Sequence, residues 1–142
     1  MAGVFHRVSM LARNDMMERF SLQKWFVESG FKPPCIGIIH TIGNMQPVSQ
    51  KKVSEWIGMD PSDLVSVIDK LEKDGYVVRK RDPQDRRRQL LSLTAKGANM
   101  RKKLITVSRE AIDETLKPLT AKERETLRSI LAKVLDHHHA IN

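Results

Sequence analysis

Apolar residues recur at helical spacing through most of the chain, separated by charged and polar residues. The first such stretch predicts one long amphipathic helix, from residue 4 to about residue 29, with a stop at Gly30. Two prolines, Pro33 and Pro34, precede a mostly apolar run over residues 35–42, where the next element is expected. Its composition also suits a strand, but proline in a first turn favours a short buried helix, which Gly43 and Asn44 end.

Two further helices are predicted next, with a very short turn between them. Ser49 is a favoured N-cap for the first, and Gly58 is its C-terminal stop. Asp60 and Pro61 open the second helix as its N-cap and its first helical residue. Its apolar residues follow the spacing i, i+3, i+4, i+7: Leu64, Val67, Ile68 and Leu71. Two helices joined by such a turn are the sequence form of a helix-turn-helix.

A basic β-hairpin is predicted directly after this motif. Val77 and Val78 supply the apolar positions of its first strand, and Leu91 and Leu93 those of its second. Between them lie two acids, Asp82 and Asp85, and six basic residues: Arg79, Lys80, Arg81, Arg86, Arg87 and Arg88. A cationic ribbon can lie along phosphates and place an arginine in a narrow minor groove. A solvated edge hairpin is the alternative, since Lys and Arg also protect sheet edges. The position after a helix-turn-helix favours DNA binding.

The outward face of the second motif helix is predicted to read DNA. With the apolar residues turned inward, the outward residues are Ser62, Asp63, Val65, Ser66, Asp69 and Lys70. In a helix-turn-helix this helix enters the major groove, where serines bond base edges and a valine meets a thymine methyl group. Lys70 is expected to contact a phosphate. The alternative is an ordinary amphipathic helix with a polar outer face.

The start of the first motif helix is a predicted phosphate site, formed by Ser49, Gln50 and Lys51. Exposed N–H groups and the helix dipole attract anions there. A plain cap is the alternative, and Ser49 serves as a cap in either case.

Two long helices are predicted after the hairpin. Thr94 caps the first, which Pro118 ends, and Thr120 forms a capping box with Glu123 at the start of the second. The helices over residues 94–117 and 120–138 and the first helix of the chain carry apolar stripes larger than one small winged domain covers. A homodimer is therefore expected.

Composition narrows the possible partners. The chain has 142 residues, a net charge of +8 and an isoelectric point of about 9.9, which favours a polyanion, either nucleic acid or an anionic membrane. No apolar run approaches the roughly 18 residues that span a bilayer, and the N-terminus lacks the apolar core of a signal peptide. A single cysteine, Cys35, fits a reducing cytoplasm, where we expect the protein to work.

Four segments together resemble the multiple-antibiotic-resistance regulator (MarR) family. They are Pro47–Gly58, Leu71–Val77, Asp82–Arg87 and Leu93–Gly97. The pattern Asp-x-x-Asp-Arg-Arg followed by Leu-Thr-x-x-Gly is the most specific part, and the likeness spans about residues 33 to 100. It implies a mainly α fold with a small β-hairpin wing, in which a homodimer binds palindromic operators.

The resemblance also assigns parts and residues. Within a single domain over residues 1–142, it implies a winged helix-turn-helix over 33–93 and a helical dimerisation part over 4–30 and 94–138. Arg86 becomes the wing-tip arginine of the minor groove, held by Asp85. Two departures from the commoner pattern occur: many members have Thr, Ser or Arg where Val65 and Ser66 stand, and the N-terminal extension is short. The first departure leaves the operator sequence open.

We therefore predict a sequence-specific regulator of double-stranded DNA that represses transcription. The predicted DNA-contacting residues are Ser49, Gln50, Lys51, Ser62, Asp63, Val65, Ser66, Lys70, Arg79, Arg81, Asp85, Arg86, Arg87 and Arg88. The alternative is a winged-helix protein-interaction module whose basic face only aids solubility. No nucleophile–base constellation or phosphate-cradling glycine loop is present, so no enzyme activity is expected.

Three residues of the apolar second helix, Ile36, Ile39 and His40, are predicted to line a pocket for a small aromatic or anionic effector; a fully packed junction is the alternative. Some family members sense peroxides with a cysteine in the first helix. Cys35 instead opens the second helix, so it is interpreted as a small core residue, with a redox sensor as the alternative. No cofactor or metal is expected, although the run His137–His139 could bind metal adventitiously or be a mere tail.

Overall fold

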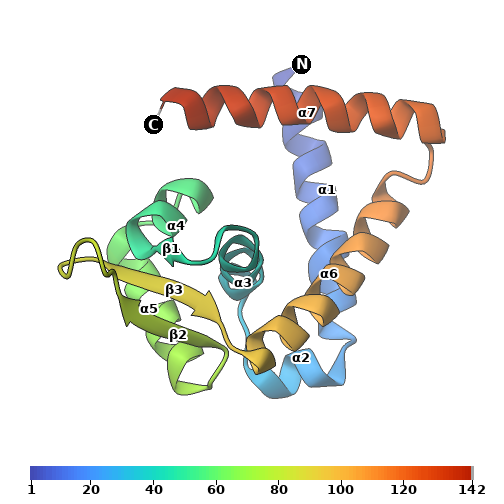
Figure 1. The fold of residues 1–142 in the computed structure, drawn as a ribbon. Coiled ribbons are helices and arrows are strands. Elements are labelled where there is room, and N and C mark those ends of the chain that lie inside the picture. Colours follow the sequence, from blue (N-terminus) through green and yellow to red (C-terminus); the bar gives the residue numbers. More distant parts are fainter. Residues whose placement is uncertain (142) are drawn as a thin grey trace. The chain divides into compact units, whose positions relative to one another are not determined.

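The computed structural model describes the backbone of residues 1–141 and the side chains of residues 1–138. The helices are α1 (Ala2–Ser21), α2 (Lys24–Ser29), α3 (Pro33–Met45), α4 (Gln50–Ile57), α5 (Pro61–Lys73), α6 (Ala95–Thr115) and α7 (Ala121–Ile141). The strands are β1 (Val48–Ser49), β2 (Val77–Arg81) and β3 (Gln89–Leu93) (Figure 1). The predicted mainly α fold with a small hairpin is confirmed. The side chain of His139, part of the predicted histidine run, lies outside the described residues.

The chain divides into two compact units. One consists of Glu28–Thr106 and the other of Met1–Val27 together with Val107–Asn142, so the two halves of α6 belong to different units. Among the described helices, none combines the length and the apolar character that crossing a bilayer requires.

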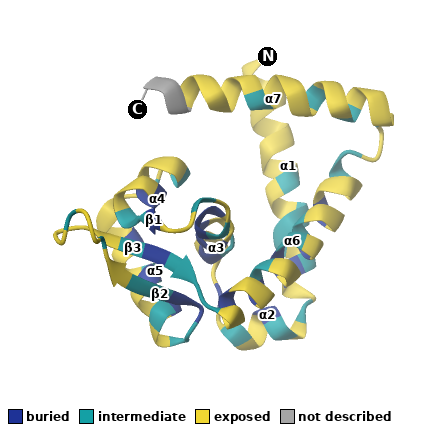
Figure 2. Ribbon diagram, viewed as in Figure 1, coloured by how far each residue is buried: buried dark blue, intermediate teal, exposed yellow. Residues whose placement is uncertain are grey.

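The Glu28–Thr106 unit packs α3, α4 and α5 against an antiparallel sheet with strand order β1-β3-β2. β2 and β3 form the predicted hairpin, in the register that pairs Val77 with Leu93. The fully buried side chains come from both the helices and the sheet: Ile38, Ile39, Ile42, Val53, Leu64, Ile68, Leu71 and Leu91 (Figure 2). Strand β1 was not predicted, because two residues are too few to show an alternating pattern; Val48 pairs with Leu91, which lies far along the chain.

The predicted helix ends of the helix-turn-helix are confirmed. The Ser49 hydroxyl accepts a hydrogen bond from the backbone N–H of Lys52 at 3.2 Å. Gly58 follows α4 with a φ of 65°, a left-handed conformation that glycine adopts without a steric cost. The Asp60 carboxylate accepts from the backbone N–H of Ser62 at 2.8 Å and caps α5. These local contacts fix where the two helices start and how they turn.

The expected end of α3 at Gly43 and Asn44 is wrong, since the helix continues through both residues to Met45. Gly43 has a packing role instead. The Arg101 side chain of α6 lies so close to it that a Cβ atom would overlap the side chain. The glycine therefore provides space within a helix rather than ending one.

The expected single helix over residues 4–29 is also wrong, because the chain breaks between α1 and α2. Phe20 and Phe26 are both buried, and their ring centroids lie 4.7 Å apart. Six residues of a continuous helix turn through about 600°, which would direct the two rings to different sides. The break lets both rings join one aromatic cluster with Trp25, whose ring meets each of them edge-on.

The unit formed by Met1–Val27 and Val107–Asn142 has two further features, a contact between α1 and α6 and a capping box on α7. The Thr115 hydroxyl of α6 donates to the Asp15 carboxylate of α1 at 2.8 Å, and Arg19 lies 3.7 Å from Glu110, so α1 and α6 are in contact. The predicted capping box of α7 is confirmed. The backbone N–H of Thr120 donates to the Glu123 carboxylate at 2.8 Å, and the Thr120 hydroxyl accepts in return at 3.3 Å.

Candidate nucleic-acid interface

The exposed side of α5 carries the residues that were predicted to read bases. Its opposite side is fixed in the core by Leu64, Ile68 and Leu71, which are fully buried. A helix repeats every 3.6 residues, so this packing leaves the remaining side in solvent. The exposed residues there are Ser62, Asp63, Val65 and Ser66. Small side chains at this end of a helix let its backbone approach a DNA groove closely.

Ser62 has one specific chemical capability. Its hydroxyl donates to the Asp60 carboxylate, and this hydrogen bond holds the pKa of Asp60 below its usual range. With its proton engaged, the hydroxyl offers lone pairs to an incoming donor. In the major groove, such donors are the amino groups of adenine and cytosine.

Lys70 lies near the C-terminal end of α5, where the sequence predicted a phosphate contact. Its ammonium group is 2.6 Å from the Asp74 carboxylate, and this hydrogen bond raises the pKa of Lys70. The ammonium group of Lys70 therefore stays protonated, but the adjacent Asp74 carboxylate offsets part of its positive charge.

The start of α4 exposes a second cation. The Lys51 side chain is 82% exposed, and its ammonium group lies 3.7 Å from Glu55, one helical turn away. An exposed pair at this distance is weak. Ser49 and Gln50 are only partly exposed, and the Ser49 hydroxyl is occupied by the cap. Of the three predicted phosphate-site residues, Lys51 is thus the exposed one.

The tip of the β2–β3 hairpin is a tight turn built from backbone contacts. The backbone N–H of Asp82 donates to the carbonyl of Arg88 at 3.0 Å, and the N–H of Arg88 donates to the carbonyl of Asp85 at 2.9 Å. The Asp82 carboxylate also accepts from the N–H of Gln84 at 2.9 Å. These bonds hold the tip without using its arginine side chains.

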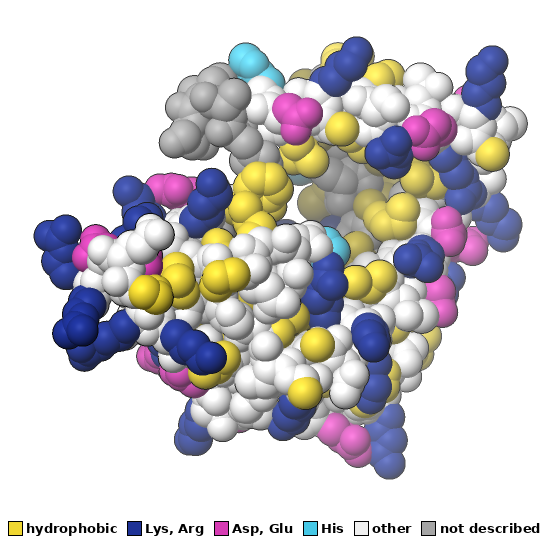
Figure 3. Space-filling view, in the orientation of Figure 1, with side chains coloured by type: hydrophobic (Ala, Val, Ile, Leu, Met, Phe, Trp, Pro, Cys, Tyr) yellow, Lys and Arg dark blue, Asp and Glu magenta, His cyan; other side chains and the backbone are white. Residues whose placement is uncertain are grey.

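The arginines of the tip are exposed. Arg81, Arg86, Arg87 and Arg88 all lie on the surface. Within the described part of the chain, the Arg86 side chain has no hydrogen-bond or ion-pair partner. Lys and Arg side chains gather at the end of the unit where Figure 1 places the hairpin (Figure 3). The Arg86 guanidinium, exposed and without a described partner at a hydrogen-bonded tip, suits insertion between phosphates.

Asp85 contacts Arg87 rather than Arg86, its expected partner from the family resemblance. The Asp85 carboxylate accepts from the backbone N–H of Arg87 and from its guanidinium, both at 3.1 Å. The bond from the Arg87 side chain holds the pKa of Asp85 below its usual range. Asp85 therefore shapes the turn and leaves Arg86 free to face solvent.

Arg79 differs from the other wing arginines, although the sequence grouped it with them. Its side chain is only 16% exposed and lies 2.6 Å from Asp69 and 2.5 Å from Glu72, both on α5. The sequence carried part of this signal, although not the contact between β2 and α5. Strand residues alternate, so Arg79 shares its face with buried Val77, and the two acids are three residues apart on one helix side. Glu72 was not among the predicted site residues.

The three residues of the predicted effector pocket occupy different environments. Ile39 is fully buried in the core, Ile36 is partly buried and His40 is exposed. The side-chain nitrogen of Asn44 lies 3.1 Å from Nε2 of His40, and the Arg101 guanidinium donates to the Asn44 oxygen. Partial desolvation of the ring by neighbouring protein atoms, and then the charge of Arg101, lower the pKa of His40 although the residue is exposed. Asn44 and Arg101 were missed because they meet His40 only once α3 and α6 pack together.

Cys35 is buried, and burial raises the pKa of its thiol. A thiol with a raised pKa forms little of the reactive thiolate, which agrees with the core interpretation. Among the described residues, no group of three or more His, Cys, Asp or Glu side chains is arranged to hold a metal ion.

Comparisons with known proteins agree with this geometry. Residues 33–88 match the MarR family. The chain is 30% identical over 106 residues to the HTH-type transcriptional regulator SarZ of Staphylococcus aureus, an alignment that covers 70% of this chain and 69% of that protein. It is 27% identical over 110 residues to the uncharacterized HTH-type transcriptional regulator YkoM of Bacillus subtilis, covering 78% of this chain and 71% of that one.

Solved structures share the fold. A MarR transcriptional regulator from Methanosarcina mazei Go1 superposes with a TM-score of 0.83 at 20% identity over all of both chains. Wild-type MarR from E. coli, in its apo form, superposes with a TM-score of 0.77 at 24% identity, covering 95% of this chain and 96% of that one. At these identities the likeness concerns the fold alone.

Proposed function

Because the chain belongs to the MarR family of winged helix-turn-helix transcriptional regulators, we propose that it represses transcription as a homodimer on a palindromic operator. The family assignment also confirms the prediction of a DNA-binding regulator and not an enzyme. The observation that supports the finer proposal most is the exposed polar side of α5 beside a wing tip of exposed arginines. A regulator of chromosomal DNA works where the chromosome lies, so we place it in the cytoplasm.

The two parts of the interface have different tasks in this proposal. Contacts to base edges discriminate between sequences, whereas contacts to phosphates position the protein. The α5 residues Ser62, Asp63, Val65 and Ser66 face the base edges of the major groove. Arg86 enters the minor groove beside it. Phosphates are contacted by the remaining predicted groups: Ser49, Gln50, Lys51, Lys70, Arg81, Arg87 and Arg88. Asp85 holds the shape of the wing tip.

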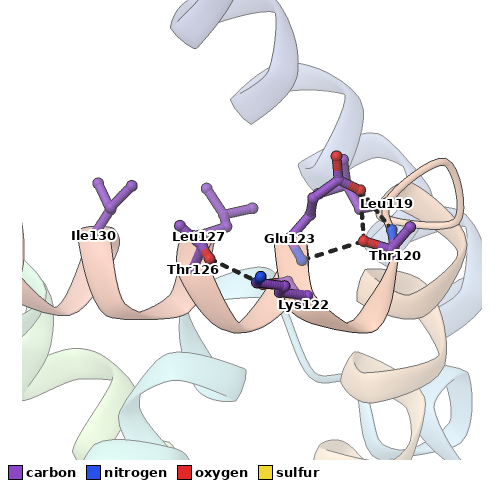
Figure 4. A pocket seen from close by; sticks show the side chains of 7 residues that line it. All are labelled: Leu119, Thr120, Lys122, Glu123, Thr126, Leu127 and Ile130. Carbon is purple, nitrogen blue, oxygen red and sulfur yellow. Dashed lines mark hydrogen bonds between the residues drawn. The ribbon is translucent and has the colours of Figure 1, made fainter.

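The dimer is proposed from apolar surface that one chain leaves uncovered. Large apolar side chains are exposed along both terminal helices: Val4, Phe5, Val8, Leu11, Ile130, Leu131, Val134 and Leu135. At the start of α7 they continue into a hollow of about 550 Å³, which Leu119, Leu127 and Ile130 line with polar neighbours (Figure 4). A second copy of the chain would remove this surface from water. Two-fold symmetry then matches a palindrome whose half-sites lie about 34–36 Å apart.

Operator binding as a function of salt tests the proposal. Fragments protected in footprinting on genomic DNA supply the operator, and a scrambled duplex of equal length is the control. A repressor contacting several phosphates loses affinity steeply as salt rises, because bound counterions are released. We expect that slope on both duplexes and a preference of at least about a thousandfold for the operator. A protein-interaction module would instead bind both duplexes equally weakly.

A small anionic effector that releases the DNA is the second part of the proposal. The Arg101 guanidinium bonds only to a neutral amide among the described residues, and His40 lies beside that amide. A carboxylate placed there would gain a charged partner. Titration of phenolic acids should weaken operator binding by about 1–3 kcal/mol, a typical coupling between two sites. If such acids bind near His40 while the operator affinity stays constant, the site is not a switch.

A further inference from the structure

Arg79 at the base of the wing forms a closely bonded charged cluster with two acids of α5. Its guanidinium donates to the Glu72 carboxylate at 2.5 Å and lies 2.6 Å from that of Asp69. The backbone N–H of Arg79 donates to the second oxygen of Glu72 at 3.2 Å. Both the main chain and the side chain of β2 are therefore bonded to α5. We call Arg79, Asp69 and Glu72 the wing clasp.

The electrostatics of the wing clasp differ from those of a DNA contact. Burial by itself would lower the pKa of Arg79, but the hydrogen bonds to Asp69 and Glu72 more than offset this and raise it. One cation faces two anions, so the cluster carries no positive charge for a phosphate. The guanidinium is also mostly buried, whereas Arg81 and Arg86, farther along the same hairpin, are exposed. Arg79 is thus bonded inside the protein.

We propose that Arg79 is a positioning residue, which holds the wing at a fixed offset from α5 so that both elements reach their grooves at once. This inference rests on the proposed binding of α5 and the wing to neighbouring grooves. Two contacts on one rigid body bind more tightly than two loosely connected ones, because the second contact then costs little extra ordering. Loosening the wing clasp should weaken binding although no DNA contact is lost.

The substitution Glu72→Gln separates positioning from simple charge. It removes a negative charge near the DNA, so electrostatics alone would tighten binding. It also replaces an acceptor of two bonds from Arg79 with a neutral amide, which loosens the wing clasp. Positioning therefore predicts weaker binding from a change that makes the protein more positive. The two explanations have opposite signs.

The substitution Arg79→Lys separates positioning from a phosphate contact. Lysine keeps the charge, and a phosphate accepts either residue as a cation. It lacks the planar fork that reaches two carboxylates at once. Positioning predicts that Arg79→Lys weakens binding, with a salt slope equal to that of the wild-type protein. The matched control is Lys80→Arg on the same strand, an exposed residue outside the proposed DNA contacts, for which near-wild-type affinity is expected.

The deciding experiment compares two DNA duplexes for each variant of the full chain. One is the complete operator, and the other is shortened so that α5 keeps its major groove but the wing has no DNA to reach. On the complete operator we expect Glu72→Gln and Arg79→Lys to bind on the order of tenfold more weakly than the wild-type protein. On the short duplex all three proteins should bind equally.

Other outcomes would overturn the inference. Equal or tighter binding of Glu72→Gln to the complete operator would show that charge, not position, matters. An equal loss on both duplexes would mean that the substitutions damage α5 itself. A salt slope lowered by about one in Arg79→Lys or Glu72→Gln would reveal a lost phosphate contact. Wild-type protein that binds neither duplex would refute the proposed function, and the inference would fall with it.

Discussion

The two units of the chain use the same helical periodicity with opposite results. In the Glu28–Thr106 unit, the apolar residues of α5 point into a closed core, where Leu64, Ile68 and Leu71 are fully buried. In the other unit, α7 follows a similar pattern, yet Ile130 and Leu135 remain more than half exposed. The apolar stripe of α5 is buried by the rest of its own unit, whereas that of α7 stays exposed to solvent. Periodicity therefore shows which side of a helix is apolar and favours burial. It does not show whether other parts of the same chain bury that side.

The difference also separates two tasks. We call the Glu28–Thr106 unit the closed unit and the other the open unit. The closed unit holds its surface residues in place, since the caps of α4 and α5 and the wing clasp depend only on neighbours within that unit. The open unit presents a surface that a second copy is proposed to cover. Local contacts thus set the shape of one DNA-reading module, and in the proposed dimer association would set the distance between two of them.

Ending the chain after Pro118 should have the largest effect. It removes α7 with its exposed stripe and leaves the closed unit complete. We expect a monomer in sedimentation that has lost operator binding, with the backbone amide signals of Glu28–Thr106 preserved in an NMR spectrum. The full-length variant Val134→Glu places a charge on the same stripe and should also dissociate the dimer. A truncated chain that sediments as a DNA-binding dimer would contradict the proposed interface.

Alanine substitutions in the two units should differ in their dependence on protein concentration. Leu71→Ala removes a fully buried side chain of the closed core and should destabilise it by about 2–5 kcal/mol. Its denaturation midpoint should shift equally at two protein concentrations that differ about a hundredfold. Leu135→Ala trims a side chain that one chain leaves exposed. Its loss should shrink at the higher concentration, because mass action restores the dimer. Identical behaviour of the two variants would remove the distinction between the units.

Arg86→Ala should weaken operator binding by about 1–3 kcal/mol, by analogy with the loss of a specific arginine contact. The closed unit should keep its stability, since the Arg86 side chain is exposed and has no partner among the described residues. The measurements are operator affinity and a thermal melt. Asp85→Asn is a useful companion, because it loosens the turn at the tip while it leaves Arg86 in place. A folded Arg86→Ala dimer with wild-type affinity would exclude this residue from the minor groove.

Features decided by neighbours in sequence were predictable. Ser49, Asp60 and the pair Thr120–Glu123 cap helices through bonds that span three residues or fewer. The periodicity of α5 likewise identified its exposed side. Features decided by packing were missed: nothing near Leu22 signals the break between α1 and α2, which depends on the ring of Phe26 joining that of Phe20.

The candidate site shows the same division. The exposed residues of α5 and of the wing tip follow from periodicity and turn chemistry. The pairing of Arg79 with Asp69 and Glu72 requires β2 to lie on α5, a contact between elements that no local pattern specifies. Composition grouped all the arginines of the hairpin together, although only three-dimensional packing shows which of them are used inside the protein.

The smallest expected effect is a change of folding stability with pH, and this change also differs between the two units. His40 is the one histidine of the closed unit, while the others lie in the terminal segments. Partial desolvation of the ring and the charge of Arg101 lower its pKa on folding, so the unfolded chain takes up a proton first as the pH falls. The contribution of His40 to stability is therefore complete above the unfolded value of about 6.5 and declines below it, until the lower folded pKa is passed.

Two variants isolate this contribution. His40→Gln stays neutral, so its denaturation midpoint should change less than that of the wild-type protein between about pH 7.5 and pH 5. Arg101→Gln removes the nearby charge and should raise the pKa of His40, as measured from its ring signals in an NMR titration. The histidines of the other unit are present in every variant, so their titration cancels in the comparison. If wild-type protein and His40→Gln lose stability in parallel, the acid sensitivity does not come from His40.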